Sequence, residues 1–163
     1  MLRGLWTTLH SLFTKPITIQ YPEQKRPVRA RFRGRHVLKR YDNGLERCIG
    51  CALCAAACPA DAIFVEASEN TDEKRFSPGE RYASTYEINM LRCIFCGFCE
   101  DACPTEAIVL GDNYEITFTE RENSVYTRDF LLEPVPAGAK PTPQQTEPGV
   151  FTRSVPEMKD PTD

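Results

Sequence analysis

Apolar side chains near the start of the chain follow the period of an amphipathic helix. Within residues 1–14 they recur at intervals of three and four residues, with mostly polar positions between them. The apolar face that this pattern predicts consists of Leu2, Leu5, Trp6, Leu9, Leu12 and Phe13. Such a helix is too short to span a bilayer, but its aromatic and apolar face suits a membrane interface or a partner protein. Packing on the chain's own small domain is the alternative that the pattern leaves open.

Further along, short apolar and β-branched stretches predict a small α+β domain over residues 41–112. Strands are expected at residues 60–65, 86–91, 105–110 and 114–119. Short helical turns are expected at residues 55–57 and 100–102. Residues 68–85 are rich in polar residues, Pro and Gly, and are expected to form an inserted loop. Residues 113–163, which become proline-rich towards their end, are expected to form an extended or disordered tail.

Charge is distributed unevenly along the chain. The net charge is −3, but residues 1–41 carry ten Lys or Arg and a single acid. Most of these cations fall in residues 16–40, which we expect to form an extended basic arm with Arg29, Arg31, Arg33 and Arg35 on one face. Anionic lipid, an acidic protein surface and a merely solvated face all remain open as reasons for this charge. Nucleic acid is disfavoured because no recognition fold accompanies the arm.

All eight cysteines fall into two runs of one pattern. Cys48–Pro59 and Cys93–Pro104 both read C-x2-C-x2-C-x3-C-P, and the second run repeats the first at an offset of 45 residues. This is the run of bacterial ferredoxins with two 4Fe-4S clusters, in which the fourth cysteine ligates the other cluster. It therefore predicts two clusters in a pseudo-twofold, ferredoxin-like core. The predicted ligands are Cys48, Cys51, Cys54 and Cys103 for the first cluster, and Cys93, Cys96, Cys99 and Cys58 for the second.

Disulfide bonds or structural zinc would also account for so many cysteines. A disulfide framework suits a secreted chain, but the N-terminus lacks the features of a secretory signal. Structural zinc typically uses paired C-x2-4-C motifs rather than two overlapping quartets. The sequence therefore predicts a one-electron carrier in a reducing compartment, with no catalytic side chains of its own.

Beyond the cysteines, the chain resembles subunit I of NADH-quinone oxidoreductase (respiratory complex I). The resemblance covers about residues 15–132. It rests on the cysteine runs together with Tyr21–Glu23, Arg31–His36, Ser77–Tyr82 and Tyr86–Ile108. It implies an electron-relay subunit that passes single electrons from the NADH-oxidising arm, through two 4Fe-4S clusters, towards a terminal cluster and quinone. The eight cysteines match the ligands of that family position by position.

The resemblance also implies partners and a location. The chain would be a peripheral membrane protein on the cytoplasmic side of a bacterial inner membrane, or on the matrix side in an organelle. It would contact cluster-bearing hydrophilic subunits and the quinone-site membrane subunit, with the helix of residues 1–15 and the arm of residues 16–40 at the membrane surface. The alternatives are a relay subunit of a membrane-bound hydrogenase or formate hydrogenlyase, a freely diffusing two-cluster ferredoxin, and a zinc protein that bridges other subunits. The proline-rich tail departs from the family's pattern.

Overall fold

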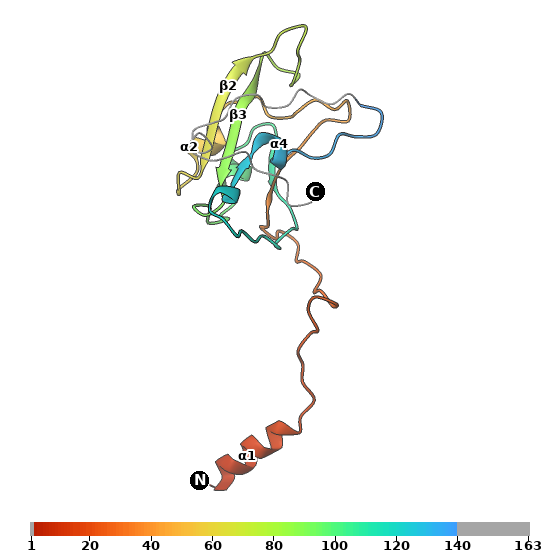
Figure 1. The fold of residues 1–163 in the computed structure, drawn as a ribbon, viewed down its shortest axis with the longest axis vertical. Coiled ribbons are helices and arrows are strands. Elements are labelled where there is room, and N and C mark those ends of the chain that lie inside the picture. The colour runs from red at the N-terminus through yellow and green to blue at the C-terminus, as the bar shows by residue number, and fades with distance from the viewer. Residues whose placement is uncertain (1, 140–163) are drawn as a thin grey trace. The chain divides into compact units, whose positions relative to one another are not determined.

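The computed structural model describes residues 2–139, and the chain divides into two units. These are Met1–Ala30 and Arg31–Asp163 (Figure 1). The boundary at Arg31 falls inside the segment predicted as a basic arm, so the end of that segment belongs to the compact unit. Residues 140–163, most of the predicted proline-rich tail, lie outside the described residues.

The first unit contains the helix that the apolar period predicts. It is α1, Leu2–Leu12, and none of its described residues is buried. The apolar face is exposed as well, with exposed fractions of 66% for Leu5 and 70% for Trp6. Residues 14–30 contain turns and neither helix nor strand. None of the helices in the described part of the chain has the length and apolar character needed to cross a bilayer.

The second unit is built around two small antiparallel sheets (Figure 1). One pairs β1 (His36–Leu38) with β4 (Ile108–Leu110). The other has the order β2 (Ile63–Glu69), β3 (Arg81–Asn89) and β5 (Val125–Thr127). Side chains from both sheets meet in a core whose most buried members include Leu38, Tyr86, Ile88 and Ile108. The predicted mixture of helices and strands in one small domain is confirmed.

Two one-turn helices occupy matching places in the two cysteine runs. They are α2 (Leu53–Ala56) and α3 (Phe98–Asp101). Each begins two residues earlier than the turn expected from sequence, so the third cysteine of each run is inside a helix. These cysteines, Cys54 and Cys99, are buried. The remaining short helices are η1 (Glu122–Ser124) and α4 (Arg128–Leu131), which the sequence did not predict.

The expected loop at residues 68–85 is wrong at both ends, because residues 68–69 lie on β2 and residues 81–85 lie on β3. β2 and β3 pair from Ile63 opposite Ile88 to Glu69 opposite Arg81. The side chain of Asn70 stabilises the loop that remains, residues 70–80: its Nδ2 donates to the carbonyls of Ser77 and Gly79. Burial along β3 does not alternate, since Thr85, Tyr86, Glu87 and Ile88 are all buried, so a period of two could not reveal this strand.

The strand expected at residues 114–119 is also wrong, since the structure has no strand there. Ile116 and Phe118 instead pack their side chains against the core while their backbone stays outside both ladders. The third strand of the larger sheet is β5, in a segment that the sequence left as polar tail. Ile116 and Phe118 thus face the core without lying on a strand, whereas Tyr114 is exposed.

The sequence repeat is also a repeat of backbone conformation. Left-handed residues occur in pairs 45 positions apart: Gly50 (φ 65) with Phe95 (φ 53), Ala52 (φ 59) with Gly97 (φ 86), and Asp61 (φ 45) with Glu106 (φ 50). Side chains other than glycine rarely adopt this conformation. The two runs therefore fold into loops of the same shape, even where only one member of a pair is glycine.

Replacing Gly50 by alanine is expected to destabilise the second unit strongly. The left-handed conformation costs about 1–2 kcal/mol for a residue with a Cβ atom. A Cβ at Gly50 would also lie 2.8 Å from the carbonyl oxygen of Tyr82 and 2.9 Å from the Cβ of Ala67. Gly79→Ala is the matched control, because its nearest neighbour is a side-chain atom of Ile49 at 3.4 Å. Urea unfolding of the two variants should separate them, and equal stability would contradict the expectation.

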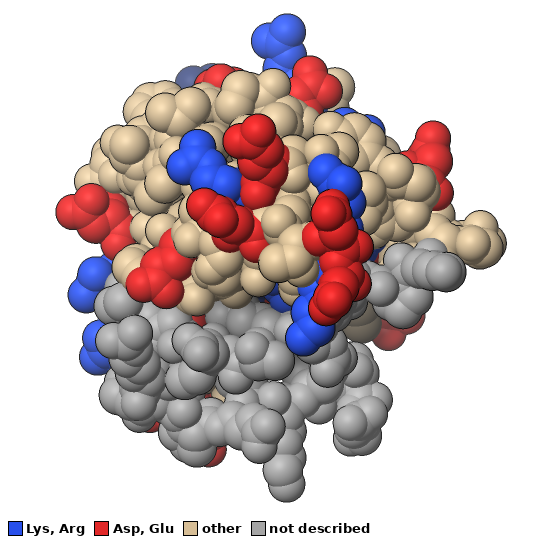
Figure 2. Space-filling model, turned by 90° about the horizontal axis from the view of Figure 1, so that it is seen from above, with Lys and Arg blue, Asp and Glu red and all other residues tan. Residues whose placement is uncertain are grey.

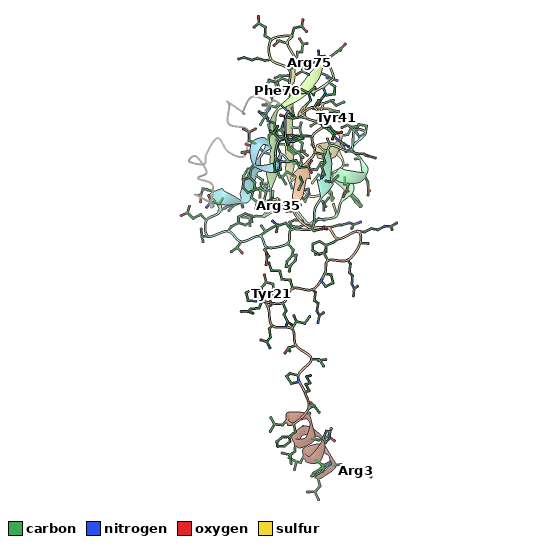
Figure 3. The ribbon with its side chains drawn as sticks, turned by 90° about the vertical axis from the view of Figure 1, so that its right-hand side faces the viewer. Arg3, Tyr21, Arg35, Tyr41, Arg75 and Phe76 are labelled. Atoms are coloured by element: carbon green, nitrogen blue, oxygen red, sulfur yellow. The ribbon has the colours of Figure 1, made fainter. Side chains whose placement is uncertain are left out.

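The arginines at the start of the second unit do not form one row. Arg31 is left-handed, with φ 63, so residues 29–35 are not a single extended strand. Figure 3 marks Arg35 in the second unit. Its guanidinium lies 5.3 Å from the ring centre of Phe130. Arg33 lies beside Gly97, where an added Cβ would be 3.0 Å from its Nε. On the face of the molecule shown in Figure 2, acidic and basic side chains are intermingled over the coloured surface.

Candidate iron–sulfur centres

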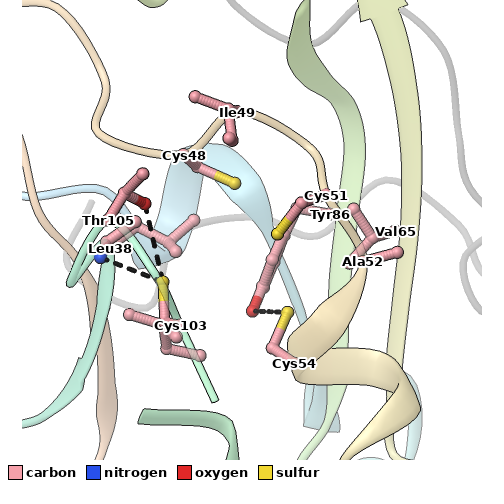
Figure 4. A pocket seen from close by; sticks show the side chains of 12 residues that line it. Leu38, Cys48, Ile49, Cys51, Ala52, Cys54, Val65, Tyr86, Cys103 and Thr105 are labelled. Atoms are coloured by element: carbon pink, nitrogen blue, oxygen red, sulfur yellow. Dashed lines mark hydrogen bonds between the residues drawn. The ribbon is translucent and has the colours of Figure 1, made fainter. Parts of the chain in front are cut away.

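One small cavity brings cysteines of both runs together (Figure 4). Its lining includes all four members of the first thiol group, which we define as Cys48, Cys51, Cys54 and Cys103. Leu38, Val65 and Ile108 supply apolar side chains to the same cavity. The fourth cysteine of the second run thus faces the first three cysteines of the first run.

The second thiol group consists of Cys93, Cys96, Cys99 and Cys58, and its members are also neighbours. Burial is the main cause that raises the pKa of Cys93, and the charges of Cys58 and Cys96 add to it. Cys99 likewise interacts with Cys93 and Cys96. It also interacts with Cys54 of the first thiol group, so the two groups adjoin in the core. The structure therefore brings the predicted ligands together in the crossed arrangement, while the ligation itself stays a prediction.

The buried thiols hold their protons tightly. Burial raises the pKa of Cys48 to about 12, and it raises the pKa of Cys99 to about 12 as well. Burial also raises the pKa of Cys54. Since metals bind the thiolate, loading of these sites must release protons.

Cys103 is the exception among the shifted thiols. Burial acts to raise its pKa, but hydrogen bonds from the backbone of Ile108 and Ala107 and from Thr105 outweigh burial, and its pKa falls below the ordinary value. Four donors on one sulfur stabilise the thiolate. Cys103 therefore forms a thiolate more readily than Cys48 or Cys54.

Backbone amides point at sulfur in both groups. Ala62 N–H donates to Cys58 Sγ over 3.4 Å, and its repeat partner Ala107 N–H donates to Cys103 Sγ over 3.2 Å. Phe95 N–H donates to Cys93 Sγ over 3.4 Å. Donors of this kind stabilise the negative charge of cluster-bound thiolates. Soft sulfur ligands, an apolar cavity and amide donors together fit a 4Fe-4S cluster at each group.

A single bound ion requires a different geometry. Within residues 2–139, no group of three or more His, Cys, Asp or Glu side chains is arranged so that it could hold one metal ion. A 4Fe-4S cluster instead takes its four thiolates on four separate iron atoms. A site for one ion and a site for a cluster therefore place their thiols differently.

Three residues near the thiols were not singled out as site residues by their sequence pattern. The hydroxyls of Tyr86 and Thr105 lie within hydrogen-bond distance of Cys54 Sγ and Cys103 Sγ. Burial raises the pKa of Tyr86 well above its ordinary value, so the phenol is protonated. His36 is the third: its Nε2 lies 3.9 Å from Cys93 Sγ, and burial lowers its pKa to about 4, so its ring is neutral. Of the three, only Thr105 had a signal in the sequence: the 45-residue repeat aligns it with Ala60, so the two runs differ at this position.

A cysteine-rich α+β fold with two adjoining groups of four thiols, each served by amide donors, defines a ferredoxin-type electron-transfer domain. Residues 47–108 match the protein family described as the 4Fe-4S dicluster domain. The chain therefore contains a 4Fe-4S dicluster ferredoxin domain, and 4Fe-4S clusters as its cofactors are supported. The number of two clusters agrees with the family's description and stays a prediction, as does the assignment of each ligand.

Among solved structures, the chain is similar to one from the membrane-bound sulfane sulfur reductase (MBS), described as an archaeal respiratory membrane complex. The two share 35% sequence identity over 80% of this chain and 61% of that chain, with a TM-score of 0.49. This chain thus spans less than two thirds of the length of that one.

Proposed function

We propose that this chain is an electron-relay subunit of an NADH:quinone oxidoreductase. It would carry two 4Fe-4S clusters, one on each thiol group, which take up and release single electrons when bound. Electrons would arrive from the NADH-oxidising arm and leave towards the terminal cluster and quinone. The chain itself would contribute ligands, amide donors and an apolar surround, and no acid–base or nucleophilic side chain.

The observation that carries the proposal is the cavity shared by Cys48, Cys51 and Cys54 with Cys103. Cysteines from two distant runs converge on one space, which is what crossed ligation of two clusters requires. The buried pair Cys54 and Cys99 joins the two thiol groups through the core. Close clusters with little intervening matter favour electron transfer between them.

The choice of complex rests on the sequence segments outside the cysteine runs, Tyr21–Glu23 and Ser77–Tyr82 among them. The exposed apolar face of α1 supports attachment to a membrane surface or to a membrane subunit. A freely diffusing ferredoxin has no evident use for such a helix. A relay subunit of a membrane-bound hydrogenase would use the same features, so the partners must separate these two possibilities.

The test is the composition of the purified chain and of its native complex. The chain, prepared without oxygen, is expected to contain about eight iron and about eight acid-labile sulfide, with the EPR signals of reduced 4Fe-4S clusters. Zinc in place of iron would refute the cluster assignment. In the native complex, a flavoprotein that oxidises NADH is the expected partner. A hydrogenase subunit in its place would refute the proposed complex while leaving the electron-relay function intact.

A further inference from the structure

Equivalent backbone amides donate hydrogen bonds to equivalent cysteines in the two thiol groups. The amide donors to Cys58 and Cys103 come from Ala62 and Ala107, which are 45 residues apart like the cysteines that they serve. The same relation links Gly50 and Phe95, whose N–H groups donate to Cys48 and Cys93. These backbone donors follow the pseudo-twofold repeat, although Cys103 has further backbone donors in Ile108 and Thr105.

Side-chain hydroxyls break this symmetry. Tyr86 Oη lies 3.4 Å from Cys54 Sγ, and Thr105 Oγ1 lies 3.6 Å from Cys103 Sγ, both in the first thiol group (Figure 4). Among the described residues, no hydroxyl has such a contact with the second thiol group. There the repeat partner of Thr105 is Ala60, which has no polar side-chain atom. The side-chain contact that the second group does have is the longer one from His36 Nε2, 3.9 Å from Cys93 Sγ.

The direction of these hydrogen bonds follows from the chemistry of a ligand. A free thiol can donate or accept, but a thiolate bound to iron has no proton to give. Both hydroxyls must then donate to sulfur. Donation withdraws electron density from the sulfur and stabilises the reduced, more negative cluster, so it raises the reduction potential. Tyr86 is 1% exposed, and the low local dielectric strengthens its bond to Cys54.

We propose that Tyr86 and Thr105 are tuning residues for the first thiol group: their O–H donors raise the reduction potential of the cluster bound there, independently of the cluster on the second group. The inference rests on the proposed function, since it needs both clusters in place. The two clusters would then differ in reduction potential because of these two side chains, a difference that the sequence repeat alone would not produce. The first cluster would accept electrons more readily than its backbone donors alone allow.

The test measures both potentials in the full chain with its clusters bound, by EPR during a redox titration. Tyr86→Phe keeps the ring in the core and removes only the hydroxyl, whose contact is with Cys54. We expect one potential to fall and the other to stay unchanged, with about eight iron per chain retained. Thr105→Val should lower the same potential by a smaller amount, because its contact is longer and less buried.

The repeat supplies the reciprocal experiment. Ala60→Thr places a hydroxyl beside Cys58, at the position that Thr105 occupies beside Cys103. It is expected to raise the potential that Tyr86→Phe leaves unchanged, while Ala60→Val, of the same shape without the hydroxyl, should not. The tuning role would be overturned if Tyr86→Phe shifted both reduction potentials equally. It would also be overturned if both Tyr86→Phe and Thr105→Val left both reduction potentials unchanged. Failure of the unaltered chain to bind iron and sulfide would overturn the proposed function as well, so the two failures are distinct.

Discussion

Replacing Cys58 by alanine is expected to remove the cluster of the second thiol group, although Cys58 belongs to the first run in sequence. Iron should fall from about eight to about four atoms per chain, since a 4Fe-4S cluster needs four cysteine ligands. The remaining cluster would be the one held by Cys48, Cys51, Cys54 and Cys103. Iron analysis and EPR of the purified variant provide the measurement.

The physical reason is the course of the chain after α2. Cys54 is inside α2 and faces the cavity of the first thiol group. The helix ends at Ala56, and Cys58 does not line that cavity. Cys58 acts instead on the pKa of Cys93, and Ala62 N–H donates to its sulfur. The turn at the end of the helix therefore directs the fourth thiol of the run away from the first three.

Double variants decide which cysteines share a cluster. If Cys58 and Cys93 ligate one cluster, replacing both should cost no more iron than replacing Cys58 alone, and about four atoms should remain. Replacing Cys58 together with Cys48 should then remove nearly all of the iron. Ligation within each run predicts the reverse for both pairs, so that pattern would refute the crossed arrangement. Cys103→Ala is the symmetric control and should spare the second cluster.

The grouping of the cysteines could be predicted because it follows from spacing rather than from tertiary context. Two runs at a fixed offset contain all eight cysteines. In the structure, Cys103 of the second run lies beside Cys48, Cys51 and Cys54 of the first. The hairpin of β2 and β3 could not be predicted in the same way. Beyond Glu66 most of its strand residues are polar or alanine, and they form strands because β2 and β3 pair with each other, which is a contact between distant positions.

The left-handed backbone conformation of the cysteine runs could be predicted from the sequence only in part. Gly50 and Gly97 both adopt the left-handed conformation in the cysteine runs, yet they are not repeat partners of each other. Their partners are Phe95 and Ala52, which adopt the same left-handed conformation without being glycine. The surroundings impose this conformation, and a sequence pattern that relies on glycine finds only two of the six left-handed positions in the three repeat pairs. Tyr86 was likewise missed, because a tyrosine in a strand looks like any other core aromatic until its hydroxyl is placed beside Cys54.

Introducing charge on the apolar face of α1 is expected to weaken membrane association of the full chain strongly. Leu5→Glu combined with Leu9→Glu should weaken binding to vesicles of phosphatidylcholine and phosphatidylserine more than tenfold. Full burial of one such side chain contributes about 1.5–3 kcal/mol, and about 1.4 kcal/mol corresponds to a factor of ten. Two charged replacements therefore exceed that factor even if the membrane buries each leucine only in part. Cosedimentation with vesicles is the measurement.

The matched control places the same charges on the opposite side of the helix. Thr7 and Ser11 lie on the polar face, and their hydroxyls bond only to nearby backbone carbonyls of α1. Thr7→Glu combined with Ser11→Glu changes the net charge as much as the leucine pair does, so repulsion by anionic lipid is equal in both variants. If apolar insertion anchors the chain, the threonine–serine pair should lose far less binding than the leucine pair. Equal loss in the two variants would mean that the arginines and lysines of residues 15–40 hold the chain at the membrane by charge. The apolar face of α1, on which Trp6 is 70% exposed, would then be covered by a protein partner instead.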